Sequence, residues 1–146
     1  MPIQKEIYKV AVQSTVRSWR YRFGRYALVG CICPTCDVTY YPQRRICPTC
    51  HNRELPEKML SRTGTVVSWA VNYLATMGFM EAIPTVRAFI QLDDHGPVIF
   101  SDIVDCDPDS IQEGTRVEMV VRRVKRESNG NLQYAHKWRP ISRSQS

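Results

Sequence analysis

The chain has 146 residues, 43% of them hydrophobic, and a formal net charge of +6. This length and composition are typical of one ordinary domain, or of two very small domains that share a core. No run approaches the about 18 apolar residues of a membrane span, and the first residues, MPIQKEIYKV, carry charges where a signal peptide has its apolar stretch. We therefore expect a cytoplasmic protein without a membrane partner, whose reduced cysteines are metal ligands or catalytic thiols rather than disulfides.

The charge is unevenly distributed along the chain. Residues 1–30 carry six basic side chains against one acidic, residues 63–115 one against eight, and residues 116–146 eight against two. The total charge alone would indicate a nucleic-acid partner. Basic ends around an acidic middle make that interpretation less secure.

The N-terminal segment, residues 1–30, predicts an amphipathic helix that ends near Gly24. Four apolar side chains fall within about 60° of one another on a helix: Val12, Val16, Trp19 and Phe23. Four arginines occupy the rest of the circumference: Arg17, Arg20, Arg22 and Arg25. One interpretation is a helix docked on a core with solvated arginines. A second interpretation is that Trp19 and the arginines contact another protein or an anionic ligand, since Trp and Arg are enriched among interface anchors.

The tetrapeptide CPTC occurs twice, with ten residues between the copies. A two-residue gap lets both sulfurs of one tight turn face a common point, so two turns complete the tetrahedron of thiolates that zinc prefers. The predicted ligands of one structural zinc ion per chain are Cys33, Cys36, Cys47 and Cys50. The intervening DVTYYPQRRI is suited to a hairpin whose Tyr40, Tyr41 and Pro42 pack beside the metal.

The cysteine cluster could also serve iron binding or redox chemistry. Iron in the same site remains open, because the sequence does not choose between tetrahedral S4 metals. A thiol oxidoreductase would instead have a single pair at the start of a helix after a strand. A closed shell of four cysteines offers no position for water or substrate, which indicates a structural metal.

The remaining cysteines and the histidines are predicted to have no catalytic role. Cys31 and His51 flank the cluster as spare donors outside the metal shell. Cys106 lies in DCDPD, where the neighbouring carboxylates would raise its pKa. His95 and His136 have no evident acid or nucleophile partner, so we assign them surface or packing roles.

After HNRELPEKMLSRTG, which reads as a linker, the hydrophobic period becomes two. The predicted buried faces are Val67, Trp69, Val71 and Tyr73, then Val86, Ala88, Ile90 and Leu92, then Val117, Met119 and Val121. PVIFSDIV and LQYAHKW add two further strands. Five short strands without crossover helices favour an OB-type barrel. We therefore predict a mainly β chain with a helical segment (1–30), a ribbon and linker (31–62), a barrel (63–140) and a flexible tail (141–146).

The order of these features resembles one known family over nearly the whole chain. A Trp/Arg helix, RYALVGCICPTC, YYPQR, a second CPTC and a barrel ending in YAHKWRP are similar to the zinc-ribbon/OB-fold proteins called acyl-CoA-associated, or domain of unknown function thirty-five. The resemblance implies a rubredoxin-like zinc ribbon with Cys33, Cys36, Cys47 and Cys50 as ligands. Many members have glycine after each pair of ligands. Here Asp37 and His51 stand there, and aspartate tolerates the left-handed backbone better than most residues do.

The resemblance also implies a non-catalytic accessory subunit. Archaeal members of this length join acetoacetyl-CoA thiolase to 3-hydroxy-3-methylglutaryl-CoA synthase in the mevalonate pathway, so both enzymes are expected partners in a hetero-oligomer. CoA phosphates could then lie near Arg17, Trp19, Arg20, Arg22 and Arg25. Some relatives instead serve lipid degradation, so a subunit of another thiolase-type enzyme is a second hypothesis.

A nucleic-acid module and an enzyme are hypotheses from two different classes of protein. The nucleic-acid module is disfavoured, because the strands that would bind nucleic acid carry one arginine, Arg87, against Asp93, Asp94 and Asp102. The enzyme is disfavoured because it needs an open metal position or an exposed thiol of low pKa.

Overall fold

The computed structural model describes residues 15–20, 22–74, 83–126 and 130–141. Its N-terminal part contains two short helices, α2 (Thr15–Arg20) and α3 (Arg22–Ala27). Val12 of the predicted helical face and the tail from 142 onward lie outside the described residues. Among the described helices, none is long and apolar enough to cross a membrane.

The helix does not end near Gly24, as the sequence predicted. Gly24 lies inside α3, which continues to Ala27. The next residue, Leu28, has a left-handed backbone with φ of 51° and a fully buried side chain. A left-handed residue cannot continue a right-handed helix. The helix therefore ends before the buried Leu28 and not at the glycine.

The ribbon is a three-stranded antiparallel sheet in the order β2-β1-β3. Its strands are β1 (Val29–Cys33), β2 (Val38–Tyr40) and β3 (Glu57–Met59). The third strand lies in the segment predicted to be only a linker, and that prediction is wrong at this point. Glu57 and Met59 are exposed, so β3 has no buried face and shows no apolar alternation.

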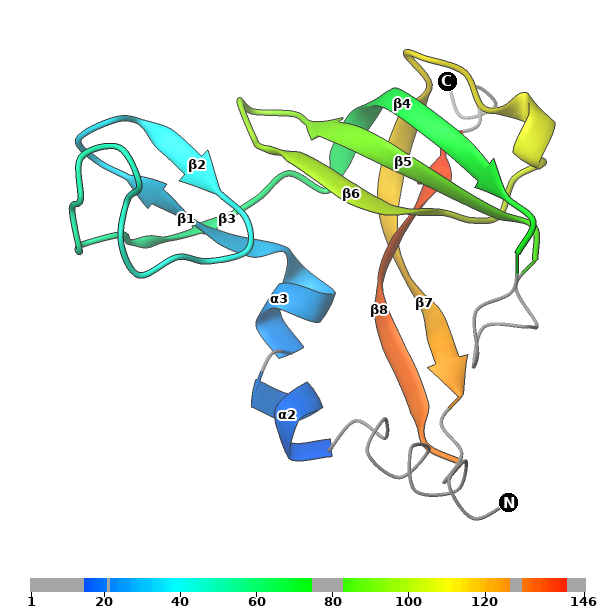
Figure 1. The fold of residues 1–146 in the computed structure, drawn as a ribbon, viewed down its shortest axis with the longest axis horizontal. Coiled ribbons are helices and arrows are strands. Elements are labelled where there is room, and N and C mark those ends of the chain that lie inside the picture. The colour runs from blue at the N-terminus through cyan, green and yellow to red at the C-terminus, as the bar shows by residue number, and fades with distance from the viewer. Residues whose placement is uncertain (1–14, 21, 75–82, 127–129, 142–146) are drawn as a thin grey trace.

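The second sheet is a closed barrel in the order β4-β5-β6-β8-β7, which confirms the predicted five-stranded OB fold (Figure 1). A short 3-10 turn, η2 (Pro108–Ser110), stands between β6 and β7. The strands are β4 (Thr63–Asn72), β5 (Thr85–Leu92), β6 (Val98–Ile103), β7 (Arg116–Arg126) and β8 (Leu132–Pro140).

The predicted inward face is confirmed on β5, where all four of its residues are buried. It is only partly right on β4, where Val71 packs against the core but Val67, Trp69 and Tyr73 are exposed and Val66 is buried instead. A β-bulge between Val66 and Ser68 shifts the pairing with β5 by one residue. Side chains along a strand alternate between its two faces. One extra residue therefore puts the side chains after the bulge on the opposite face from the one that the pattern before it predicts.

The predicted face of β7 is confirmed only at its barrel end. Val117 is buried and Met119 packs against the core, but Val121 is exposed. The far halves of β7 and β8 project from the barrel as a hairpin (Figure 1). Its residues therefore have fewer neighbours to bury them.

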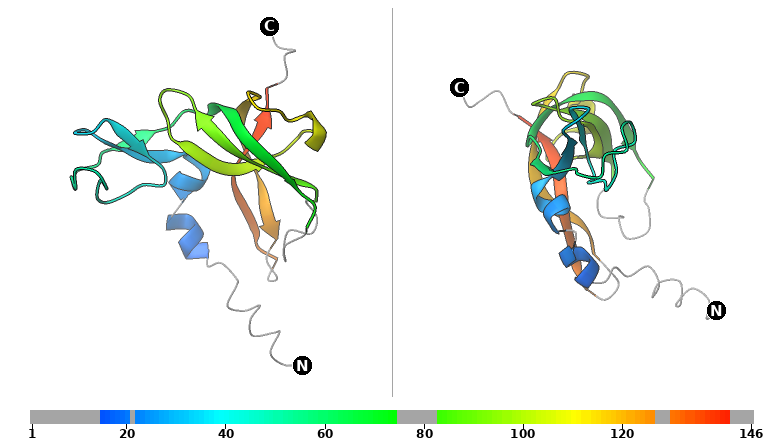
Figure 2. Two further views of the ribbon diagram at one scale, coloured as in Figure 1. Left: turned by 45° about the horizontal axis from the view of Figure 1, so that its top comes forward. Right: turned by 90° about the vertical axis from the view of Figure 1, so that its left-hand side faces the viewer.

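One hydrophobic core joins both parts of the molecule. Leu28 before the ribbon and Leu60 after it belong to the same buried cluster as Ile90 and the fully buried Trp138 of the barrel. The ribbon lies at one end of the barrel, and α2 and α3 run beside β8 (Figure 2). The helices, the ribbon and β8 therefore meet in one region.

Candidate metal centre and docking groove

The structure brings together the four cysteines that the sequence singled out. The sulfur atoms of Cys33, Cys36, Cys47 and Cys50 all lie within 4.8 Å of one another, and those of Cys33 and Cys50 are 3.4 Å apart. Four thiolates at the usual zinc–sulfur distance would be separated by about 3.8 Å in a tetrahedron. The donor set and its spacing thus fit a tetrahedral metal with a closed protein shell.

Both halves of the cluster are built by the same turn. The amide of Asp37 donates to the carbonyl oxygen of Cys33 at 2.8 Å, and the amide of His51 donates to that of Cys47 at 3.0 Å. Asp37 and His51 both have left-handed backbones, with φ of 53° and 57°. These are the positions where glycine is common in similar ribbons, and the turn geometry is kept without it.

The surroundings of Cys47 favour its thiolate, the form that binds a metal. The backbone amide of Cys50 and the Tyr40 hydroxyl, 3.4 Å from the Cys47 sulfur, lower the pKa of Cys47 to about 5. The thiol of Cys36, by contrast, has its pKa raised to about 12, first by its hydrogen bond with Cys50. Crowded thiols cannot all ionise without a cation between them, so a bound metal would favour the thiolate form of all four cysteines.

Of the hairpin residues predicted to pack beside the metal, Tyr40 does so and Tyr41 does not. The Tyr41 hydroxyl donates to the Gly24 carbonyl oxygen at 2.9 Å, and its ring packs edge-on against His136 of β8. Burial lowers the pKa of His136, whose Nδ1 lies 3.2 Å from the Arg25 carbonyl oxygen. Tyr41 therefore connects the ribbon to α3 and to the barrel. Pro42 is exposed.

The spare donors lie outside the cluster. Within the described residues, the four cysteines form the one group of three or more His, Cys, Asp or Glu side chains placed to hold a metal. Cys31 is buried, and its sulfur accepts a hydrogen bond from the Arg44 amide at 3.3 Å. The pKa of Cys106 is raised, first by burial and then by Asp105 and Asp107, so the direction predicted from the sequence is right but its main cause is burial.

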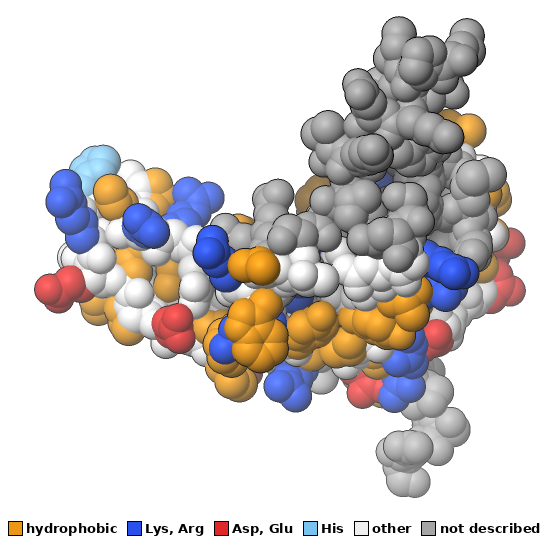
Figure 3. All heavy atoms as spheres, turned by 90° about the horizontal axis from the view of Figure 1, so that it is seen from below, with side chains coloured by type: hydrophobic (Ala, Val, Ile, Leu, Met, Phe, Trp, Pro, Cys, Tyr) orange, Lys and Arg blue, Asp and Glu red, His pale blue; other side chains and the backbone are white. Residues whose placement is uncertain are grey.

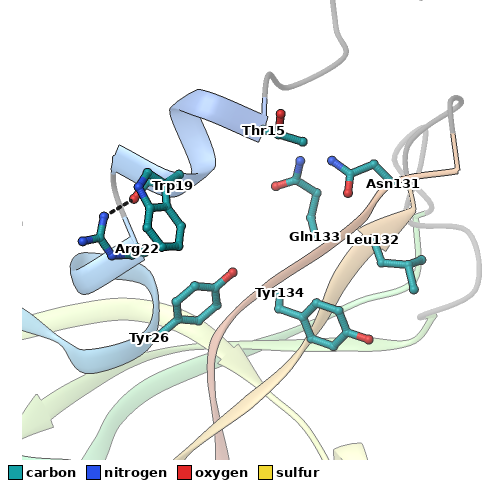
Figure 4. A pocket seen from close by; sticks show the side chains of 8 residues that line it. All are labelled: Thr15, Trp19, Arg22, Tyr26, Asn131, Leu132, Gln133 and Tyr134. Atoms are coloured by element: carbon teal, nitrogen blue, oxygen red, sulfur yellow. Dashed lines mark hydrogen bonds between the residues drawn. The ribbon is translucent and has the colours of Figure 1, made fainter.

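A groove of about 430 Å³ lies between the two helices and β8 (Figure 4). The rings of Trp19 and Tyr26 lie on the side of the helices facing β8, and Gln133 points from β8 toward the helices. The residues that line the groove are Thr15, Trp19, Arg22, Tyr26, Asn131, Leu132, Gln133 and Tyr134.

The helices do not dock through an apolar face, so the first interpretation of that segment is wrong. Val16, Trp19 and Phe23 are 57%, 66% and 58% exposed. Instead, α3 is tied to the ribbon hairpin and β8 by hydrogen bonds through the carbonyl oxygens of Gly24 and Arg25 and the side chain of Arg25. The apolar side chains are left at the surface.

The structure places the predicted arginines in different surroundings. Arg25 donates to the Gln133 side-chain oxygen at 2.8 Å and so helps to fix α3 on β8. Arg22 lies 4.1 Å above the Trp19 ring and 4.4 Å above the Phe23 ring. Arg20 is exposed, and the side chain of Arg17 lies outside the described part of the chain. The residues of β8 that line the groove were not identified from the sequence, because nothing local in the sequence shows that β8 lies beside the helices.

A second exposed pair of aromatic residues was also missed. Phe89 of β5 and Phe100 of β6 are directly paired, with ring centroids 5.1 Å apart, and are 48% and 58% exposed. Aromatic residues at these strands could stack on bases. The neighbouring Arg87, however, is already engaged in an ion pair with Asp102 at 3.5 Å, and the second cation on Asp102, Lys137 at 3.3 Å, is buried.

Comparison with known proteins agrees with a zinc ribbon followed by an OB barrel. Family models for the ChsH2 rubredoxin-like zinc ribbon domain and the ChsH2 C-terminal OB-fold domain match residues 23–56 and 57–122. A DUF35 domain-containing scaffold protein of Methanocaldococcus jannaschii is 38% identical over 136 residues, covering 92% of this chain and 96% of the relative. One from Methanothermobacter thermautotrophicus is 41% identical over 128 residues, covering 86% and 96%.

The chain therefore belongs to the DUF35 family. A solved structure named "Ltp2-ChsH2(DUF35) aldolase" matches with a TM-score of 0.65 at 23% identity, covering 85% of this chain and 89% of that one. At this identity the likeness concerns the fold.

Proposed function

We propose that this chain is a non-catalytic scaffold subunit that holds an acetoacetyl-CoA thiolase and a 3-hydroxy-3-methylglutaryl-CoA synthase together. The observation that carries the proposal is the match, over 92% of this chain and 96% of the relative, to a protein named as a DUF35 scaffold. Condensation of two acetyl-CoA molecules is thermodynamically uphill. A scaffold would help by placing the next enzyme where it draws off the product.

A non-catalytic role agrees with the chemistry of the described side chains. The four cysteines together would close the shell of a metal, and the thiol of Cys106 is disfavoured as a nucleophile by its raised pKa. His136 is mostly buried and is already engaged with the Arg25 carbonyl oxygen. None of these groups combines an open position with a neighbouring acid or base.

We further propose that the cluster holds one structural zinc ion, with Cys33, Cys36, Cys47 and Cys50 as its ligands. The metal would cross-link the two turns and neutralise thiolates that would otherwise repel one another. Its role is to fix the shape of the ribbon. Iron would fit the same donor set, and metal analysis separates the two.

The groove between the helices and β8 supports a docking role. It presents Trp19 and Arg22 at the surface, two residue types that dominate interface energies. We assign the enzyme contact to this side of the molecule, with Arg20 and Arg25 on the same helices. The phosphates of CoA would be near the same arginines when a thioester passes between the enzymes.

A second candidate is an accessory subunit of a different thiolase-type acyl-CoA enzyme. The observation in its favour is that both matching family models are ChsH2 domains, and the similar solved structure is named as an aldolase. In either case the chain would be a binding subunit. A nucleic-acid module receives less support, because Arg87, beside the exposed rings of Phe89 and Phe100, is already paired with Asp102.

The test is to tag the full chain in its native host, purify it gently, identify the co-purifying proteins and measure zinc and iron per chain. Recovery of a thiolase and the synthase with about one zinc supports the scaffold and the metal assignment. Recovery of an aldolase or another acyl-CoA enzyme selects the second candidate. Recovery of nucleic acid without either enzyme rejects both.

A further inference from the structure

The surface around the groove combines exposed apolar side chains from two distant parts of the sequence. Single exposed hydrophobic residues are normal on a protein surface, whereas a contiguous group marks a site of interaction. Figure 3 shows the hydrophobic side chains gathered in a stripe across this face, with Lys and Arg side chains beside it. The exposed apolar residues of the helices and β8 are Val16, Trp19, Phe23, Tyr26, Leu132 and Tyr134.

Both walls of the groove come from segments without a carboxylate. No acidic residue occurs between Glu6 and Asp37, and none follows Glu127. The first segment contributes α2 and α3, and the second contributes β8. The charged side chains that these two segments bring to the groove are therefore arginines, Arg22 in its lining and Arg25 on Gln133, which favours an anionic partner.

Arg22 is held ready for such a partner. Its guanidinium donates to the Trp19 carbonyl oxygen at 3.0 Å while it stacks over the rings of Trp19 and Phe23. A side chain already fixed in place loses less conformational entropy on binding than a free arginine does. Its remaining N–H groups can still donate to a carboxylate.

These features distinguish between the possible occupants. A second copy of this chain would place one acid-free surface against another, which like-charge repulsion opposes. A nucleotide would fill the groove but leave the exposed rings and aliphatic groups outside it uncovered, including Val16 and Phe23. A helix with an apolar stripe and flanking carboxylates would cover both the groove and its borders.

We propose that this groove binds an acidic amphipathic helix of one of the partner enzymes. The inference rests on the proposed scaffold function and adds the chemistry of the partner to it. Apolar side chains of that helix would pack on Trp19 and Tyr26, and its Asp or Glu side chains would pair with Arg22. Binding would weaken as salt rises, since the ion pairs at the rim are exposed to solvent.

The experiment measures the affinity of the full chain for each purified partner enzyme by calorimetry at several salt concentrations. Trp19→Ala and Arg22→Glu should each weaken binding of one enzyme about tenfold or more. Phe100→Ala, which removes an exposed aromatic on the barrel, and Arg53→Glu, which reverses an exposed charge on the ribbon, should change it less than about threefold. All four side chains are exposed or half-buried, so circular dichroism should show a native fold in each variant.

A second variant identifies the partner group. Arg22→Lys introduces an amine that a carbodiimide can couple directly to a carboxylate. Peptide mapping should then locate the cross-link on an Asp or Glu of a helix in the partner enzyme. A cross-link to another copy of this chain would overturn the assignment of the occupant.

The failures are separable. If neither enzyme binds the unmodified chain, the proposed function is wrong. If the enzymes bind and both groove variants keep the unmodified affinity, or Phe100→Ala is the variant that weakens binding, the scaffold stands and the groove is not its docking surface.

Discussion

The ribbon and the barrel bury different kinds of side chain. At the centre of the ribbon the buried residues are cysteines, Cys31, Cys33 and Cys47, whereas the barrel buries aliphatic side chains around Trp138. A sheet of three short strands cannot bury enough apolar surface to fold by itself, and coordination can replace that missing energy. The barrel is held by its apolar cluster. Metal coordination and apolar burial would thus be two different sources of stability in one short chain.

The two parts are nevertheless coupled at their border. Leu28 and Leu60, which flank the ribbon in sequence, lie in the barrel cluster, and Tyr41 reaches from the ribbon hairpin to α3 and His136. Loss of the ribbon should therefore affect the barrel only at this border. Perturbing each part separately measures how far the two are independent.

Removal of the metal should have the largest effect. A structural zinc contributes about 10 kcal/mol or more to the folding of small zinc domains, so a chelator or Cys47→Ser should unfold the ribbon. Hydrogen exchange should show loss of protection in β1 and β2 with retained protection in β5. Cys106→Ser is the matched control and should leave both parts protected. Unfolding of the whole chain on chelation would contradict the independence of the barrel.

A cavity in the barrel should have the next largest effect. Trp138 is fully buried, and Trp138→Ala should lower the free energy of unfolding by about 3–5 kcal/mol through lost burial and the cavity left behind. Urea titration monitored by far-UV circular dichroism measures this change. Trp69→Ala, at a side chain 40% exposed, should cost much less. Similar losses for both variants would mean that the barrel core is not where the structure places it.

The turns of the metal site should respond unequally to glycine. His51 has a left-handed backbone, which costs a non-glycine residue about 1 kcal/mol or more, so His51→Gly should stabilise the ribbon by about that amount. Thermal unfolding with metal bound measures the gain. Asp37→Gly should gain less, because aspartate tolerates this conformation better. An unchanged or lower midpoint for His51→Gly would mean that the imidazole makes a stabilising contact.

The smallest effect concerns an ion pair on the barrel rim. Asp93 accepts two hydrogen bonds from Arg116 at 2.7 Å and one from Thr63, and these lower its pKa from 3.8 to about 2. Because the folded pKa lies below the unfolded value, the stabilisation is present above about pH 4 and is lost as the pH falls toward about 2.

Asp93→Asn should therefore reduce stability at neutral pH by under about 1 kcal/mol, since the pair is partly solvated. It should also flatten the dependence of the unfolding free energy on pH between about 4 and 2. Chemical denaturation across this range measures both. The neighbouring Asp94→Asn is the control, and an equal loss of slope in that variant would remove the assignment to Asp93.

Periodicity predicted the strands better than it predicted their faces. On β5 every inward residue was identified, because both neighbouring strands pair with it over nearly its whole length. On β4 the bulge at Val66 and Ser68 changed the face, and in β3 no apolar pattern existed to find. A bulge and a polar edge strand are stabilised by partners far away in sequence, and local patterns do not contain that information.

The sequence by itself determined which four cysteines come together. Two turns of four residues place their thiols through local geometry, so the spacing of Cys33, Cys36, Cys47 and Cys50 was sufficient. Only the tertiary structure decided which residues line the groove. Arg25 and Gln133 stand 108 positions apart in the chain, yet their side chains share a hydrogen bond. Contacts between residues so far apart in sequence depend on how the helix, ribbon and barrel pack together. No hydrophobic period or motif spacing in the sequence contains that information.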